Sequence, residues 1–144
     1  MQNLKKYFFI CLVFIYVGYS CSKNSKNTSN APSGYVDAQL NITLPTYNTL
    51  ANPTGFVYIP GGVRGVIVYR KSPTEFMAYE RNCTYQSSNA CATVSVDATH
   101  FFGIDSCCGS KFLLSDGTVN KGPATVPLTR YQVTFDGTTV HVFN

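Results

Sequence analysis

The chain has 144 residues, enough for one small domain and too few for two once an N-terminal targeting segment is set aside. It contains ten Tyr, ten Phe, eleven Gly and no Trp, a composition typical of strands and turns rather than of helices. The formal net charge of +4 falls to +2 without Lys5 and Lys6, because nine Lys and Arg then face seven Asp and Glu. These positive charges are scattered, which excludes the basic stripe of a nucleic-acid-binding protein.

Residues 1–20 have the three parts of a secretory leader. Lys5 and Lys6 form a charged region, an apolar stretch covers 7–17, and small residues precede Cys21. The apolar stretch has about a dozen residues, fewer than the ~20 that a membrane-spanning helix needs. This pattern resembles a bacterial lipoprotein signal, which implies that Cys21 is the first mature residue and carries the lipid. The alternative is an ordinary cleaved signal peptide, in which Cys21 has no special role.

The segment 21–33 is polar and has no apolar periodicity. It cannot bury enough apolar surface to offset the entropy cost of ordering it. We therefore expect a flexible tether between the lipid and a folded domain. The leader and the tether together predict a location in the bacterial cell envelope, facing the periplasm or on the outer membrane. The expected partners are the membrane, through the lipid, and an envelope protein.

The rest of the chain, 34–144, has the pattern of an all-β domain. Turn residues such as Pro60-Gly61-Gly62 and Asp136-Gly137 separate short runs rich in β-branched and aromatic residues. The runs predict eight strands: 36–44, 54–59, 65–69, 76–80, 92–96, 111–114, 132–135 and 138–143. No segment has a convincing helical period, so a sandwich or barrel of short strands is expected.

Three groups of motifs carry a resemblance to a known family. Residues 83–86 read CTYQ with Cys91 downstream, residues 106–112 read SCCGSKF, and LSDGTV and GPATVPLTRY follow at 114–119 and 122–131. They resemble the Rieske iron–sulfur domain, where C-T-H with a further Cys precedes C-P-C-H-G-S, a hairpin with an S-D-G turn, and G-P-A-x-x-P-L-x-x-Y. The resemblance covers about 82–137. It implies an antiparallel sandwich with a small former cluster-binding subdomain at 82–128.

The resemblance also shows what has changed at the cluster. A Rieske centre needs two thiolates on one iron and two imidazoles on the other. The four positions that match those ligands hold Cys83, Tyr85, Asp105 and Cys108. The chain has only two histidines, and neither follows a cysteine at the needed spacing. We expect His141 to be an ordinary residue of the last strand and His100 a loop residue that could approach the former cluster loop.

The resemblance implies a disulfide between Cys91 and Cys107, the family's two non-ligand cysteines. In an exported chain, such a bridge is expected to form. A second bridge, Cys83 to Cys108, is predicted because both replace groups that converge on one small cluster. A redox-active pair at Cys107 and Cys108 is the rival hypothesis, although neighbouring cysteines form a strained ring.

No catalytic constellation is evident, because Ser110 has a neighbouring Asp but no positioned His base. The leading hypothesis is a membrane-anchored lipoprotein, not an enzyme, whose degenerate Rieske-like domain is a non-redox structural or binding module without cofactor or metal. The alternative is an electron-transfer protein with an unorthodox 2Fe-2S cluster on Cys83, Asp105, Cys108 and one further donor. Thiol–disulfide exchange through the loop cysteines is a third hypothesis.

Overall fold

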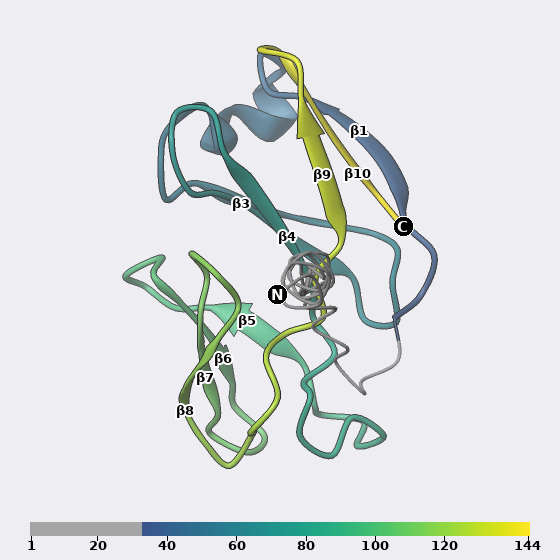
Figure 1. Cartoon of the computed structure of the whole chain (residues 1–144), viewed down its shortest axis with the longest axis vertical. Helices are drawn as coiled ribbons and strands as arrows, with labels where there is room; N and C mark the ends of the chain where they lie inside the picture. Colours follow the sequence, from purple (N-terminus) through teal and green to yellow (C-terminus); the bar gives the residue numbers. More distant parts are fainter. Residues whose placement is uncertain (1–32) are drawn as a thin grey trace, which may run out of the picture.

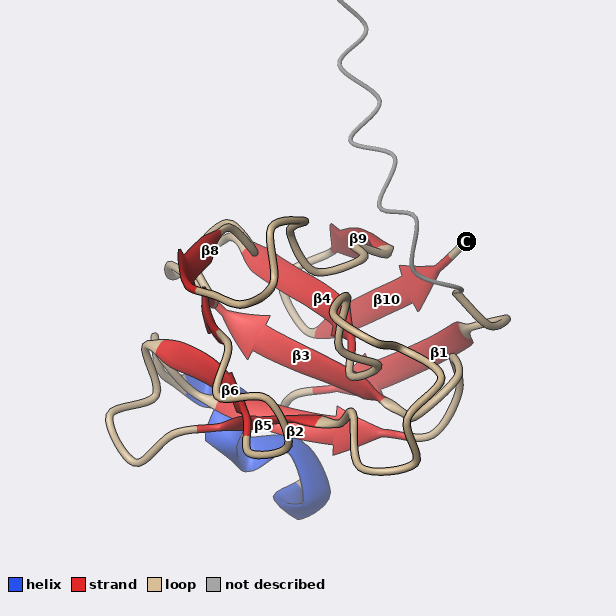
Figure 2. Cartoon of the chain, turned by 90° about the horizontal axis from the view of Figure 1, so that it is seen from below, coloured by secondary structure: helices blue, strands red, loops and turns tan. Residues whose placement is uncertain are grey.

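In this computed structural model, the structure describes residues 33–144, and the predicted signal peptide (1–20), Cys21 and nearly all of the predicted tether lie outside this range. The described part contains three antiparallel sheets and one short 3-10 helix (Figures 1 and 2). The first sheet has the order β1 (Asp37–Asn41), β10 (Thr139–Phe143), β9 (Gln132–Phe135). The second has the order β2 (Phe56–Ile59), β3 (Val66–Arg70), β4 (Phe76–Glu80). The third has the order β5 (Val94–Val96), β6 (Phe102–Asp105), β7 (Lys111–Leu113), β8 (Val119–Lys121).

Strands β3 and β4 form the middle of the molecule. Every residue of Val66–Arg70 and of Phe76–Glu80 is buried. Such strands have nearly continuous apolar sequences, because neither face meets solvent. The two strands therefore separate two hydrophobic cores.

The upper core in Figure 1 lies between β3–β4 and the sheet β1-β10-β9. Its side chains come from alternate positions of the strands and include Val66, Val68, Ala78, Val140 and Val142. The chain before β9 bonds directly to β4, because Glu80 N donates to Thr129 O (2.9 Å) and Tyr131 N donates to Ala78 O (3.0 Å). These bonds close the sandwich on one side.

The lower core lies between the other face of β3–β4 and the sheet β5-β6-β7-β8. It includes Ile67, Met77, Tyr79, Val94, Phe112 and Leu114. Strand β6 approaches this core closely, since a Cβ on Gly103 would lie 2.7 Å from Cγ1 of Val94. Glycine at this position therefore allows the strand to pack where a larger residue would clash.

The structure confirms the all-β expectation and corrects its details. Each predicted strand coincides with an observed one, but strands β6 and β8 were missed. The predicted strand 36–44 ends at Asn41, whose side-chain oxygen accepts hydrogen bonds from both N and Oγ1 of Thr43 and forms a turn. The helix η1 (Pro45–Ala51) then follows and lies against β2 (Figure 2). Within 33–144, no helix is long and apolar enough to cross a membrane.

Candidate functional site

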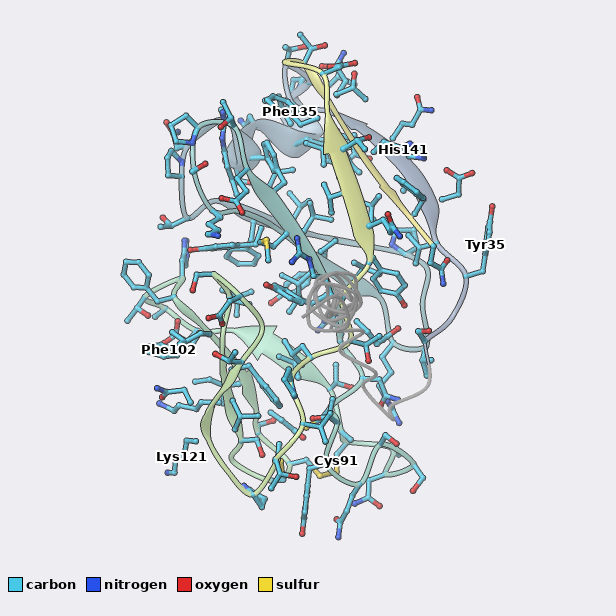
Figure 3. The ribbon with its side chains drawn as sticks, in the orientation of Figure 1. Tyr35, Cys91, Phe102, Lys121, Phe135 and His141 are labelled. Atoms are coloured by element: carbon cyan, nitrogen blue, oxygen red, sulfur yellow. A yellow bond between two sulfur atoms is a disulfide. The ribbon has the colours of Figure 1, made fainter. Side chains whose placement is uncertain are left out.

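Two loops meet at the lower end of the molecule. The first loop, 82–91, is part of the connection between β4 and β5, and the second loop, 105–110, runs from the last residue of β6 to the start of β7. A disulfide between Cys91 and Cys107 joins them, with the Cα atoms 5.6 Å apart, and Figure 3 shows Cys91 at this end. The disulfide that the Rieske resemblance implies is thus confirmed.

The first loop starts from a buried carboxylate. Oε2 of Glu80 accepts hydrogen bonds from Val63 N (2.7 Å) and from the Tyr131 hydroxyl (2.7 Å). Oε1 accepts from Arg64 N (3.0 Å) and Asn82 N (2.9 Å). Burial, and then the Glu80 carboxylate itself, raises the pKa of Tyr131, so this hydroxyl stays protonated as a donor. Four donors on one carboxylate fix the backbone where the first loop begins.

The Arg64 side chain holds the rest of the first loop. Its Nε donates to Asn82 Oδ1 (2.8 Å), while Nη1 and Nη2 donate to the carbonyls of Ala90 (2.8 Å) and Asn89 (2.6 Å). The planar guanidinium is suited to this, because its donors point in fixed directions. Neither Glu80 nor Arg64 was identified from the sequence, since most of their partners are backbone groups that leave no mark in a residue pattern.

The second loop is a tight turn closed by its own backbone. Asp105 N donates to Ser110 O (3.0 Å), and Gly109 N donates to Asp105 O (2.8 Å). Gly109 has a φ of 79°, a left-handed conformation that glycine adopts without strain. Cys107 N donates to Asp105 Oδ1 (2.8 Å), which fixes the carboxylate.

The segment 122–128, the most specific part of the motif resemblance, contacts both loops. Thr84 of the first loop donates its hydroxyl to Val126 O (2.6 Å). Ser110 of the second loop accepts a hydrogen bond at Oγ from Ala124 N (2.9 Å). This segment therefore braces the two loops in addition to the disulfide.

Three donor side chains come together between the loops. One ligand atom each from Cys83, Asp105 and Cys108 lies within 4.8 Å of the others. The two Sγ atoms are 3.9 Å apart, and Cys108 Sγ lies 3.2 Å from Asp105 Oδ2 and 3.0 Å from Ser110 Oγ. Cys83 and Asp105 are fully buried, whereas Cys108 is half-buried. These are the three residues that the sequence places at former ligand positions and that the alternative hypothesis assigns to an atypical cluster.

Cys83 and Cys108 are free thiols here, in contrast to the predicted second disulfide. Their separation of 3.9 Å is nearly twice a disulfide bond length of about 2.0 Å. The Cys108 thiol is instead oriented toward Asp105 and Ser110. Burial, with the Asp105 carboxylate adding to it, raises the pKa of Cys83 above that of an ordinary thiol. Cys83 is thus no activated nucleophile, which weakens the hypothesis of thiol–disulfide exchange.

The other residues singled out from the sequence lie around or away from this cluster. The half-buried Tyr85 side chain packs on the lower core, next to the cluster rather than within it. His100 stacks edge-on against Phe56 with ring centroids 4.9 Å apart. His141 belongs to β10, as predicted, and Figure 3 places it in the upper part of the molecule, away from Cys91.

Several solved structures are similar to this chain. One is the cyanobacterial plasma membrane Rieske protein PetC3 from Synechocystis PCC 6803, with 24% identity and a TM-score of 0.52 over 62% of this chain and 87% of that one. Another is the ferredoxin of carbazole 1,9a-dioxygenase from Nocardioides aromaticivorans IC177, with 18% identity and a TM-score of 0.49 over 74% of this chain and 97% of that one. No protein-family model and no curated protein matches the chain.

The match to the cyanobacterial protein establishes the fold, and at 24% identity it establishes the fold alone. It agrees with the motif resemblance and with the two facing loops joined by Cys91 and Cys107. In fold, the described part of this chain is a Rieske-like domain.

Proposed function

We propose that this chain is a lipoprotein of the cell envelope, not an enzyme, whose Rieske-like domain acts as a non-redox structural or binding module without a [2Fe–2S] cluster. The observation that carries the proposal is the donor set at the four former ligand positions: Cys83, Tyr85, Asp105 and Cys108. A Rieske centre requires two imidazoles on one of its irons. This set supplies none, and it places a thiol where one imidazole would stand.

Neither histidine of the chain is placed to supply an imidazole. His141 Nε2 lies 2.7 Å from Asp37 Oδ1, the distance of an N–H donor to a carboxylate oxygen, and the His141 ring stacks on Phe143. His100 packs on Phe56 in the turn before β6, whereas the former ligand Asp105 is at the other end of that strand. The residues present therefore do not fit a Rieske cluster.

The contacts within the site support the same conclusion. Cys83 and Cys108 stand at positions that serve opposite irons in a Rieske centre, so an Fe₂S₂ core would have to lie between them. Their sulfurs are 3.9 Å apart, and Cys108 is also hydrogen-bonded to Asp105. These donors contact one another where the core would separate them.

A catalytic role finds no support in the described residues. Ser110 is fully buried, and its Oγ is engaged by Ala124 N and by the Cys108 thiol. Within 33–144, neither histidine contacts this hydroxyl, so it lacks the base that a nucleophilic serine needs. The lipid anchor at Cys21 and an envelope protein as partner are proposed from the leader and tether sequence.

Metal analysis of the full chain, purified through its own export route, tests the absence of the cluster. We expect no stoichiometric iron or acid-labile sulfide and no electron paramagnetic resonance signal after reduction. The matched control is a triple variant, Tyr85→His with Asp105→Cys and Cys108→His, which restores the Cys₂His₂ set around Cys83. A coloured triple variant beside a colourless wild type supports the proposal. Near-stoichiometric iron and sulfide in the wild type would overturn it and favour an atypical electron carrier.

A further inference from the structure

We propose that Cys83, Asp105 and Cys108 form a binding site for a single Zn²⁺ ion, which links the two loops where a Rieske domain has its cluster. This inference rests on the proposed function, since one ion and an Fe₂S₂ core cannot share these donors. It assigns the site a ligand of a different chemical class: one divalent ion with mixed sulfur and oxygen coordination.

The distances between the donors match those around tetrahedral zinc. Zn–S bonds of about 2.3 Å at the tetrahedral angle separate two sulfurs by about 3.8 Å. The Sγ atoms of Cys83 and Cys108 are 3.9 Å apart. A Zn–O bond of about 2.1 Å places a carboxylate oxygen about 3.6 Å from each sulfur. Asp105 Oδ2 is 3.2 Å from Cys108 Sγ, a few tenths of an ångström below that value, and all three donor atoms lie within 4.8 Å of one another.

The groups around the donors are arranged as an outer shell. Cys107 N holds Asp105 Oδ1 at 2.8 Å, which leaves Oδ2 directed at the Cys108 sulfur. Ser110 Oγ already accepts a hydrogen bond from Ala124 N, so its own proton is available for a Cys108 thiolate 3.0 Å away. Such outer-shell bonds orient ligands and tune metal affinity.

The charge balance favours a cation over a disulfide. Asp105 is fully buried, yet no salt bridge reaches it from any residue in 33–144. The buried Glu80 has four donors, three of them backbone amides, whereas the Asp105 side chain accepts from the backbone amide of Cys107 and otherwise contacts the Cys108 thiol. Oxidation to a disulfide would remove the thiol donor and leave Asp105 Oδ2 facing two sulfurs. A bound cation satisfies the same oxygen directly.

The donor types select the metal. Two thiolates disfavour Ca²⁺ and Mg²⁺, which prefer oxygen ligands, and the carboxylate disfavours the softer Cu⁺. Zn²⁺ accepts both sulfur and carboxylate oxygen. On binding, each thiol releases one proton to the solvent. Two thiolates and one carboxylate then surround the divalent ion, and the site has a net charge of −1. Cys108 is half-buried, so solvent reaches this side of the donor group and can supply the fourth ligand.

The test measures zinc, iron and acid-labile sulfide in the full chain, purified under nitrogen without chelator. We expect about one zinc per chain and neither iron nor sulfide. After removal of the zinc, Co²⁺ should produce a thiolate-to-cobalt charge-transfer band that Zn²⁺ abolishes. Peptide mapping of the same sample should show the Cys91–Cys107 bridge intact and Cys83 and Cys108 unpaired.

Two variants locate the site. Asp105→Asn and Cys108→Ser should each weaken Zn²⁺ binding by more than about 100-fold, because loss of an outer-shell bond alone costs 10- to 100-fold. Asp136→Asn is the matched control, since it removes the same charge from the exposed β9–β10 turn at the opposite end of the molecule. Formation of the Cys91–Cys107 bridge shows that each variant is folded.

The outcomes separate the inference from the function on which it rests. A wild type without zinc and without iron, or one with a Cys83–Cys108 disulfide, overturns the zinc site and leaves the proposed function standing. Unchanged Zn²⁺ affinity in both site variants also overturns the zinc site. Stoichiometric iron with sulfide overturns both.

Discussion

Replacing the buried Glu80 by glutamine changes the shape of the side chain very little, yet it should strongly destabilise the domain. Each oxygen of the carboxylate accepts two hydrogen bonds, from Val63 N and the Tyr131 hydroxyl on one side and from Arg64 N and Asn82 N on the other. In glutamine one oxygen becomes an NH₂ group, a donor that faces donors. The Tyr131 hydroxyl can rotate to accept, but a backbone N–H then stays unpaired.

The magnitude follows from these contacts. An unsatisfied buried amide costs about 1–3 kcal/mol, and hydrogen bonds that lose their charged acceptor fall from about 1.5–3 kcal/mol toward 1 kcal/mol each. Glu80→Gln should therefore lower the free energy of unfolding by about 3–5 kcal/mol. For a domain of this length, that is a large fraction of the total stability.

Urea unfolding followed by far-UV circular dichroism, with the disulfide intact, measures the loss. Glu75→Gln is the matched control. This residue lies just before β4 and is half exposed, and among residues 33–144 its carboxylate pairs only with Lys71 at 2.9 Å, so the substitution should cost about 0.5 kcal/mol or less. Equal effects of the two substitutions would refute the reasoning from burial and donor count.

Three further predictions concern the bridge, the anchor and one turn. The double variant Cys91→Ala, Cys107→Ala should lose about 3 kcal/mol in urea unfolding, because the bridge spans a sequence separation of 16 residues; a loss near zero would show that other contacts hold the loops. Labelled fatty acid should be incorporated by the wild type and not by Cys21→Ala, and undiminished labelling of the variant would contradict lipidation there. Hydrogen bonds from the backbone and the hydroxyl of Thr118 lower the pKa of Asp116, so its ionised form favours the folded state. Above pH 3.8 the wild type should have a higher free energy of unfolding than Asp116→Asn, and this difference should vanish as the pH falls through the lowered pKa of Asp116. A difference that does not depend on pH would contradict this prediction.

The strands of the middle sheet could be predicted because their sequences leave little choice. The runs VIVYR and FMAYE are buried on both faces, and their continuous apolar character predicts strands without help from alternation. Strand β6 was missed because its Gly103, needed for close packing on Val94, weakens the strand signal. Strand β8 was missed because VNK is short, and two of its three residues are exposed.

The site could be predicted in part because motif spacing survives in a chain whose ligands have changed. The spacing placed Cys83, Asp105 and Cys108 at one location and paired Cys91 with Cys107, as the structure shows. It could not show whether Cys83 and Cys108 are bonded, because that depends on how Asp105 and Ser110 orient the Cys108 thiol. Such orientation follows from tertiary contacts rather than from residue spacing.

The mass of the intact folded chain tests most directly whether this Rieske-like domain has lost its cluster. Native mass spectrometry, applied to protein purified through its own export route and then repeated after denaturation, measures what the fold retains. We predict that the folded wild type has no additional mass corresponding to an Fe₂S₂ core. If the proposed zinc site is occupied, the folded chain is heavier than the denatured chain by the mass of one zinc ion. An increment of two irons and two sulfides that disappears on denaturation would contradict the account.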